Sequence, residues 1–207
     1  MSVAGIFLIL FLLVHLGINL TVILFDDPMV YNRAAHFMAN NIVIKVFEIV
    51  LIGGLLLHVI YALILQVQNW FARPRRYNKA NYSNTSFFSK FMIHTAAIIL
   101  TFLVIHFMDF YFRFKFGNAS EVLVDGVVYH DFATEVIDKF KMLPFVIFYI
   151  AAFMFLGFHL IHGFQSAFRT LGLDNRKYTP AVQALGVIYS VVVVAGFSVI
   201  PLVIYFM

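Results

Sequence analysis

Long apolar runs separated by short polar connections extend along the whole chain. Each run has about 20 residues or more, the length that an α-helix needs to cross the hydrocarbon core of a bilayer. The pattern therefore predicts an all-α integral membrane protein, a bundle of five transmembrane helices in a single membrane domain over residues 1–207. The helices are expected at residues 4–25, 42–67, 89–113, 142–168 and 181–206.

One further apolar pattern lies in the connection between the third and fourth runs. Phe132, Val136, Ile137 and Phe140 recur there with near-helical spacing, as in a short helix that lies along a membrane surface. Asp131 is a suitable first residue for this helix. No repeat or low-complexity segment defines a second domain.

Composition narrows the possible chemistry. The chain is 63% hydrophobic and 12% charged, whereas a soluble domain is about half apolar and a quarter charged. It has no cysteine, which excludes disulfides, iron–sulfur clusters held by its own thiolates and covalently attached haem. The net charge of +4 is modest, and no basic patch indicates nucleic acid as a partner.

The charges in the connections predict an orientation. The connections after the second and fourth runs hold eight basic residues and one acid, Asp174; the basic residues are Arg73, Arg75, Arg76, Lys79, Lys90, Arg169, Arg176 and Lys177. Positive charge is retained in the cytoplasm. We therefore expect a multi-pass protein of the cytoplasmic (inner) membrane, with its N-terminus inside and its C-terminus outside.

Four histidines lie inside four different apolar runs: His15, His58, His106 and His159. An ionisable group within a membrane is costly and normally faces the bundle interior with a partner. At about 1.5 Å of rise per residue, His58 and His159 lie at an inner depth, and His15 and His106 at an outer one. Each pair suits a b-type haem iron. A hydrogen bond to a neighbouring helix is the alternative for any single histidine.

The remaining histidines have other expected roles. His162 lies one turn after His159 and is the rival ligand in that helix, or a contact of a haem propionate. His94 is expected at the inner interface. His36 and His130 are expected in outer connections.

Two acids, Glu48 and Asp109, lie within the spans and towards their outer ends. A carboxylate inside a membrane is often part of a proton relay, so both are candidates for quinone and proton chemistry. Ion pairs with Lys45 or Arg113 are the alternative. We favour Glu48, because Asp109 lies closer to Arg113.

Five segments match a known family in order over nearly the whole chain: GIFLILFLLVHLGINL, NRAAHFM, LLLHVIYALIL, LVIHFMDFYFRF and FHLIHGFQSAF. With them the chain resembles the two-haem cytochrome b membrane subunit of succinate dehydrogenase and fumarate reductase complexes. The resemblance implies that His15 and His106 bind the iron of an outer haem b, and that His58 and His159 bind that of an inner haem b. It implies electron exchange with a quinone, menaquinone being the expected one, near the outer haem.

The same resemblance implies partner subunits on the cytoplasmic face. A flavoprotein with FAD and an iron–sulfur protein with the clusters would carry out the dicarboxylate chemistry. The basic connections would contact these partner subunits and also anionic membrane lipid. Some fumarate reductases of this type have a glutamate of a transmembrane proton path at the position of Gly157. Since glycine cannot carry a proton, the sequence does not predict such a path here.

Further contacts and alternatives complete the expectations. Ser2, Lys90 and Arg169 are candidate contacts of the inner propionates, and Arg113 of the outer ones. Four glycines would let a flat macrocycle approach the backbone: Gly17, Gly53, Gly54 and Gly157.

Two other functions are alternatives to this family. The chain could be the cytochrome b anchor of a hydrogenase or formate dehydrogenase, or a haem-free proton channel or transporter. The direction of catalysis and a higher oligomer of the complex stay open.

Overall fold

The computed structural model describes residues 1–72, 91–117, 120–173 and 175–207. In these ranges, five helices are long and apolar enough to cross a membrane, which confirms the all-α class and the five predicted spans. They are α1 (Ser2–Leu24), α3 (Ile42–Phe71), the composite helix Met92–Phe116, α8 (Leu143–Thr170) and α9 (Thr179–Phe206). The second span ends four residues later than expected and the third begins three residues later.

The composite helix has three parts: α5 (Met92–His106), η1 (Phe107–Tyr111) and α6 (Phe112–Phe116). The middle part is a π-helix, in which hydrogen bonds join residues five apart instead of four. The Phe112 N–H accordingly donates to the carbonyl of Phe107. Side chains on either side of η1 therefore follow a different register from that of a continuous α-helix.

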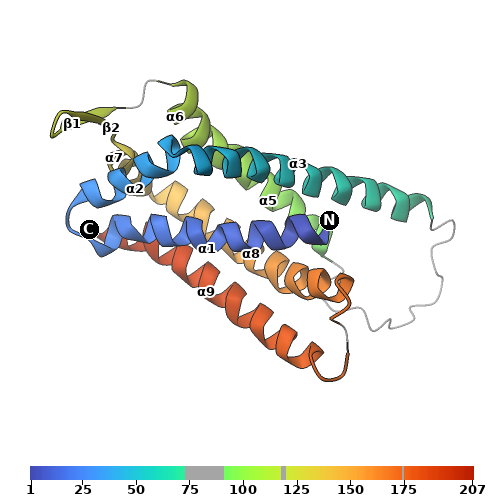
Figure 1. Cartoon of the computed structure of the whole chain (residues 1–207). Coiled ribbons are helices and arrows are strands. Elements are labelled where there is room, and N and C mark those ends of the chain that lie inside the picture. Colours follow the sequence, from blue (N-terminus) through green and yellow to red (C-terminus); the bar gives the residue numbers. More distant parts are fainter. Residues whose placement is uncertain (73–90, 118–119, 174) are drawn as a thin grey trace.

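Helix α8 is the centre of the bundle and packs against α9, α1 and α5, as Figure 1 shows. A Cβ added to Gly157 of α8 would lie 2.7 Å from Val194 Cγ2, and one added to Gly196 of α9 would lie 2.7 Å from Leu16 Cδ2. Small residues thus let these helices approach closely. Gly157, expected beside a macrocycle, instead lies in the contact between α8 and α9.

Helix α3 has a different environment. It packs against α1 and α2 (Pro28–Asn40), and none of its described residues is buried. Gly53 in its middle faces open space, since an added Cβ would meet no atom within 4 Å. In a membrane, this apolar helix would face lipid on one side and leave room for an apolar group on the other.

The two ends of the bundle differ (Figure 1). What we call the N end holds Met1, the end of α8 and the start of α9. The C end holds α2, α6, a hairpin of β1 (Glu121–Val124) and β2 (Val127–His130), and α7 (Phe132–Phe140). The charge pattern predicts that the N end faces the cytoplasm, and this orientation stays a prediction.

A buried hydrogen-bond network holds the helical cap at the C end together. Asn32, which is 1% exposed, donates to Asp131 Oδ1 at 3.0 Å and accepts from the Ala133 N–H at 2.8 Å. Asp131 also accepts from the Thr134 N–H at the start of α7, which confirms the predicted first residue of this helix. Burial raises the pKa of Asp131, but the hydrogen bonds from Asn32 and Thr134 outweigh burial and hold it below the usual value.

Two elements of the cap were not predicted, although each has a local signal. Helix α2 begins with Asp27, whose side chain accepts from the Met29 N–H, and Pro28 occupies the first turn. The hairpin turns at Asp125 and Gly126, which have φ values of 52° and 77°. An Asp-Gly pair between apolar residues is typical of a two-residue hairpin turn.

Candidate functional site

Four membrane-depth histidines form two pairs in the structure. The ring centroids of His15 (α1) and His106 (α5) lie 5.8 Å apart, with an angle of 89° between the rings. Those of His58 (α3) and His159 (α8) lie 6.4 Å apart, at 67°. These are the pairs that depth along the helices predicted. We call His15 and His106 the C-end pair, and His58 and His159 the N-end pair.

The positions of the pairs follow from their neighbours. A Cβ added to Gly5, in the first turns of α1, would lie 3.9 Å from the ring of His58, so the N-end pair lies near the start of α1. His15 is ten residues further along α1, and His106 immediately precedes the π-helical segment. The two pairs are therefore displaced from each other along the bundle, on four different helices.

The ring spacing suits a metal ion between two imidazoles. A metal–nitrogen bond is about 2 Å and a ring centroid lies about 1 Å behind its nitrogen, so two imidazoles on opposite sides of one ion have centroids about 6 Å apart. Both pairs lie close to this value. Among the described residues no group of three or more His, Asp or Glu could hold a metal ion. A haem iron, however, needs only two protein ligands, because the porphyrin supplies the others.

Buried ring nitrogens bear on the alternative of a hydrogen bond to a neighbouring helix. The Nδ1 atoms of His58, His106 and His159 are buried and have no hydrogen-bond partner among the described residues. Nearly all buried polar atoms in proteins have a partner. The alternative reading, a histidine satisfied through a neighbouring helix, finds no hydrogen bond at these atoms.

The surroundings of the C-end pair are aromatic. Rings of α1, α5, η1, α8 and α9 contact the two imidazoles: Phe11 and Phe197 at His15, and Phe102, Phe110 and Tyr149 at His106. Such a shell offers apolar surface to a macrocycle. Gly17, two residues after His15, faces open space. The donor set, its spacing and its environment thus fit b-type haem.

The other histidines lie where they do not form such pairs. It is the ring of His159 that contacts His58, while His162 is half-buried one turn further towards the N end. The remaining three have contacts near the ends of the bundle: His94 with Phe91, His36 with Tyr129, and His130 with Glu121.

Glu48 has partners on the composite helix. Lys115 Nζ lies 2.9 Å from Glu48 Oε1, and the Tyr111 hydroxyl donates to the same oxygen. The side chain of Glu48 is 23% exposed, so it lies at the edge of the bundle. The ion pair that was the alternative for this acid is therefore present, but its base is Lys115 and not Lys45 or Arg113.

Asp109 and Arg113 do not form the expected ion pair. Lys139 of α7 lies 2.9 Å from Asp109 Oδ1, whereas Arg113 pairs with Glu135 at 3.0 Å. Residues four apart face each other in an α-helix. Asp109 lies in the π-helical segment, and each of the two residues pairs with α7 instead. Such segments are frequent at functional sites, and no signal in the sequence revealed this one.

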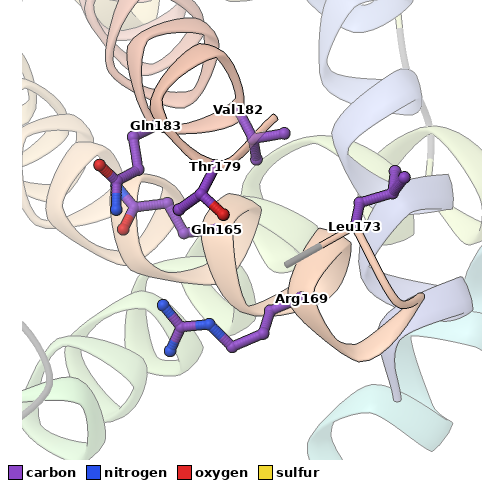
Figure 2. A pocket seen from close by; sticks show the side chains of 6 residues that line it. All are labelled: Gln165, Arg169, Leu173, Thr179, Val182 and Gln183. Atoms are coloured by element: carbon purple, nitrogen blue, oxygen red, sulfur yellow. The ribbon is translucent and has the colours of Figure 1, made fainter. Parts of the chain in front are cut away.

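The candidate propionate contacts lie at both ends. Ser2 begins α1 at the N end and Arg113 lies at the C end. Figure 2 shows Arg169 at the corner between α8 and α9, beside the polar side chains of Gln165 and Gln183. Lys90 and the basic residues 73–79 lie outside the described residues, as does Asp174.

In comparisons with known proteins, the chain matches no family model, no curated protein and no solved structure. Its function therefore has to be inferred from its own residues and their geometry.

Proposed function

We propose that the chain is the two-haem cytochrome b anchor of a succinate:quinone oxidoreductase, a succinate dehydrogenase or a fumarate reductase. The observation that carries the proposal is the presence of two histidine pairs, on four separate helices, with the ring spacing of bis-imidazole ligation. A set of unrelated buried histidines has no reason to meet in pairs. The ordered sequence segments point to this class of complex among respiratory cytochromes b.

In this proposal the side chains hold and shield the cofactors. His15 and His106 bind one b-type haem, and His58 and His159 bind the other. When bound, haem iron accepts and releases one electron at a time. The aromatic rings around the C-end pair lower the local dielectric, and through this effect the protein tunes a haem potential.

The quinone would react at the C end, beside Glu48. Quinol oxidation releases two protons and quinone reduction takes up two, so the pocket needs a group that exchanges protons with water. Glu48 is held by Tyr111 and Lys115, which gives its carboxylate a fixed position, and it lies only six residues from the C-end start of α3. Tyr111 and Lys115 would orient the carboxylate while it holds or transfers the proton.

The soluble partners would dock at the N end. Arg176 and Lys177 are exposed in the connection between α8 and α9. An iron–sulfur protein and a flavoprotein docked here would supply the clusters, FAD and dicarboxylate chemistry. The chain would then join these subunits to quinone on the opposite side of the membrane.

A reduced-minus-oxidised optical spectrum of the purified complex tests the proposal. We expect two b-type haems per chain, together with a flavoprotein and an iron–sulfur protein in equal amounts and succinate- or fumarate-linked quinone activity. A haem-free protein would exclude the proposal and favour a proton channel or transporter. Two haems with hydrogenase or formate dehydrogenase partners would assign the chain to another respiratory enzyme.

A further inference from the structure

Three buried polar atoms without a partner occur in neighbouring side chains at the C end. They are His106 Nδ1, one carboxylate oxygen of Asp109 (Oδ2) and the hydroxyl of Tyr149. None of them has a hydrogen-bond partner among the described residues, and Tyr149 is only 2% exposed. The other carboxylate oxygen of Asp109 is 2.9 Å from Lys139 Nζ.

Ring contacts place these side chains together. The ring of Tyr149 on α8 lies 6.2 Å from that of His106. It also lies 6.5 Å from the ring of Phe110 and 5.1 Å from that of Phe140, which are the chain neighbours of Asp109 and Lys139. Three elements, η1, α7 and α8, therefore converge behind His106.

The hydrogen-bonding capacities of the three atoms are complementary. A ligating histidine carries a proton on its second ring nitrogen, a tyrosine hydroxyl both donates and accepts, and a carboxylate only accepts. Leaving all three unsatisfied in a buried site would be costly. Water can both donate and accept and so can satisfy the set. An anion would be repelled by Asp109, and an apolar group would leave the atoms unsatisfied.

We propose that Asp109, Tyr149 and Lys139 hold ordered water behind His106 and that this hydrated cluster positions the imidazole. The water accepts the proton of His106 Nδ1 and donates to Asp109, while Lys139 anchors the carboxylate from α7. The role of the cluster as a positioning group rests on the proposed function, because it requires His106 to be a haem ligand. The presence of water in the cluster does not depend on the proposed function.

The cluster would make the two haems unequal. Ligating histidines commonly donate their second N–H to a carboxylate, a carbonyl or water, which makes the imidazole a stronger donor. In the described parts of the five spans, the only acids are Glu48 and Asp109, both at the C end. The cluster would thus lower the potential of the C-end haem alone.

Thermal unfolding of tyrosine variants tests the hydration, whether or not haem is bound. The hydroxyl of Tyr189, which donates to the Ile9 carbonyl at 2.7 Å, provides a matched control. We expect both Tyr149→Phe and Tyr189→Phe to lower Tm by about 2–4 °C, because each removes a hydrogen-bonded hydroxyl. An unchanged or higher Tm in Tyr149→Phe alone would overturn the proposal, because removing an unsatisfied hydroxyl does not destabilise the fold.

Redox titration of Asp109→Asn tests the positioning role. We expect a higher potential for the haem that His106→Ala removes and an unchanged potential for the haem that His58→Ala removes. Equal shifts of both haems, or no shift, would overturn the role of the cluster while leaving the two-haem proposal intact. If no haem is bound, the proposed function fails, and the comparison of the tyrosine variants still decides whether the cluster is hydrated.

Discussion

At the scale of single residues, the paired imidazoles make each histidine dependent on one specific partner. His15 and His106 come from α1 and α5, and His58 and His159 from α3 and α8, so no helix contributes to both pairs. Loss of one side chain therefore affects one site and leaves the other with both ligands. This separation allows the two sites to be tested independently.

The first prediction concerns haem content. Replacing His58 or His159 with Ala should leave one haem per chain, as should replacing His15 or His106, because a single imidazole cannot complete bis-histidine ligation. The pyridine haemochrome spectrum of the purified variants measures this. His162→Ala is the matched control and should retain both haems. Two haems in His159→Ala with one in His162→Ala would reverse the assignment of the ligand in α8.

The second prediction concerns the proton at Glu48. Glu48→Gln keeps the shape and the acceptor oxygen for Tyr111 but cannot titrate, so quinone-linked turnover should fall at least tenfold while both haems stay bound. Succinate oxidation by an artificial dye should persist in the soluble subunits. Glu121→Gln, on the exposed hairpin, is the control and should retain turnover. Normal turnover in Glu48→Gln would transfer the proton role to Asp109.

The identity of the four histidines and their pairing could be predicted because an ionisable residue in an apolar run is conspicuous and helix rise gives its depth. The partners of the two acids could not. Asp109 and Arg113 have the spacing of an ion pair on an α-helix, yet each pairs with a residue of α7 instead. Lys139, which replaces Arg113, comes from a distant connection that helical spacing does not reach.

At the scale of elements, the cap at the C end depends on one buried asparagine. Asn32 joins α2 to the start of α7 through hydrogen bonds to Asp131 and Ala133, residues about a hundred positions away. Apolar periodicity predicted α7 because this helix has one buried face. The same approach missed α2 and the hairpin, whose signals are local turn residues and not periodicity.

The third prediction is that Asn32→Ala lowers the free energy of unfolding by about 2–3 kcal/mol, because it leaves the buried Ala133 N–H and the Asp131 carboxylate without their partner. Thermal unfolding in detergent measures the loss. Asn40→Ala removes an exposed side chain that bonds only to its own helix, and should change stability by less than about 0.5 kcal/mol. Equal effects of the two variants would show that the network contributes little.

The fourth prediction follows from the lowered pKa of Asp131. A carboxyl group whose pKa is lower in the folded state stabilises the protein above its unfolded pKa, which is about 3.9 for Asp, and loses this contribution as the pH falls through the folded pKa. Stability should therefore decrease below about pH 4 more steeply in the native protein than in Asp131→Asn. Parallel pH profiles of Tm for the two proteins would contradict this linkage.

At the scale of the whole molecule, an odd number of spans places the two termini at opposite ends of the bundle (Figure 1). The number of spans could be predicted because length and hydropathy alone decide which segments can cross a bilayer. Side-chain packing between helices could not, since lipid-facing and buried positions are both apolar. Gly157 illustrates the difference. Its missing side chain allows the close contact with Val194, and hydropathy does not reveal this contact.

The fifth prediction tests whether the N end docks the soluble subunits. Arg176 and Lys177 are exposed there, and reversing both to Glu should weaken copurification of the iron–sulfur subunit while haem content stays at two. Matched reversals of Arg33 and Lys141, two exposed basic residues at the C end, control for the change in net charge. Because salt screens both the native attraction and the repulsion in the variant, the defect should be largest at about 0.05 M ionic strength and smaller at about 0.15 M. If both double variants retained the partner equally at the lower salt, these basic residues would serve topology and contact with anionic lipid alone.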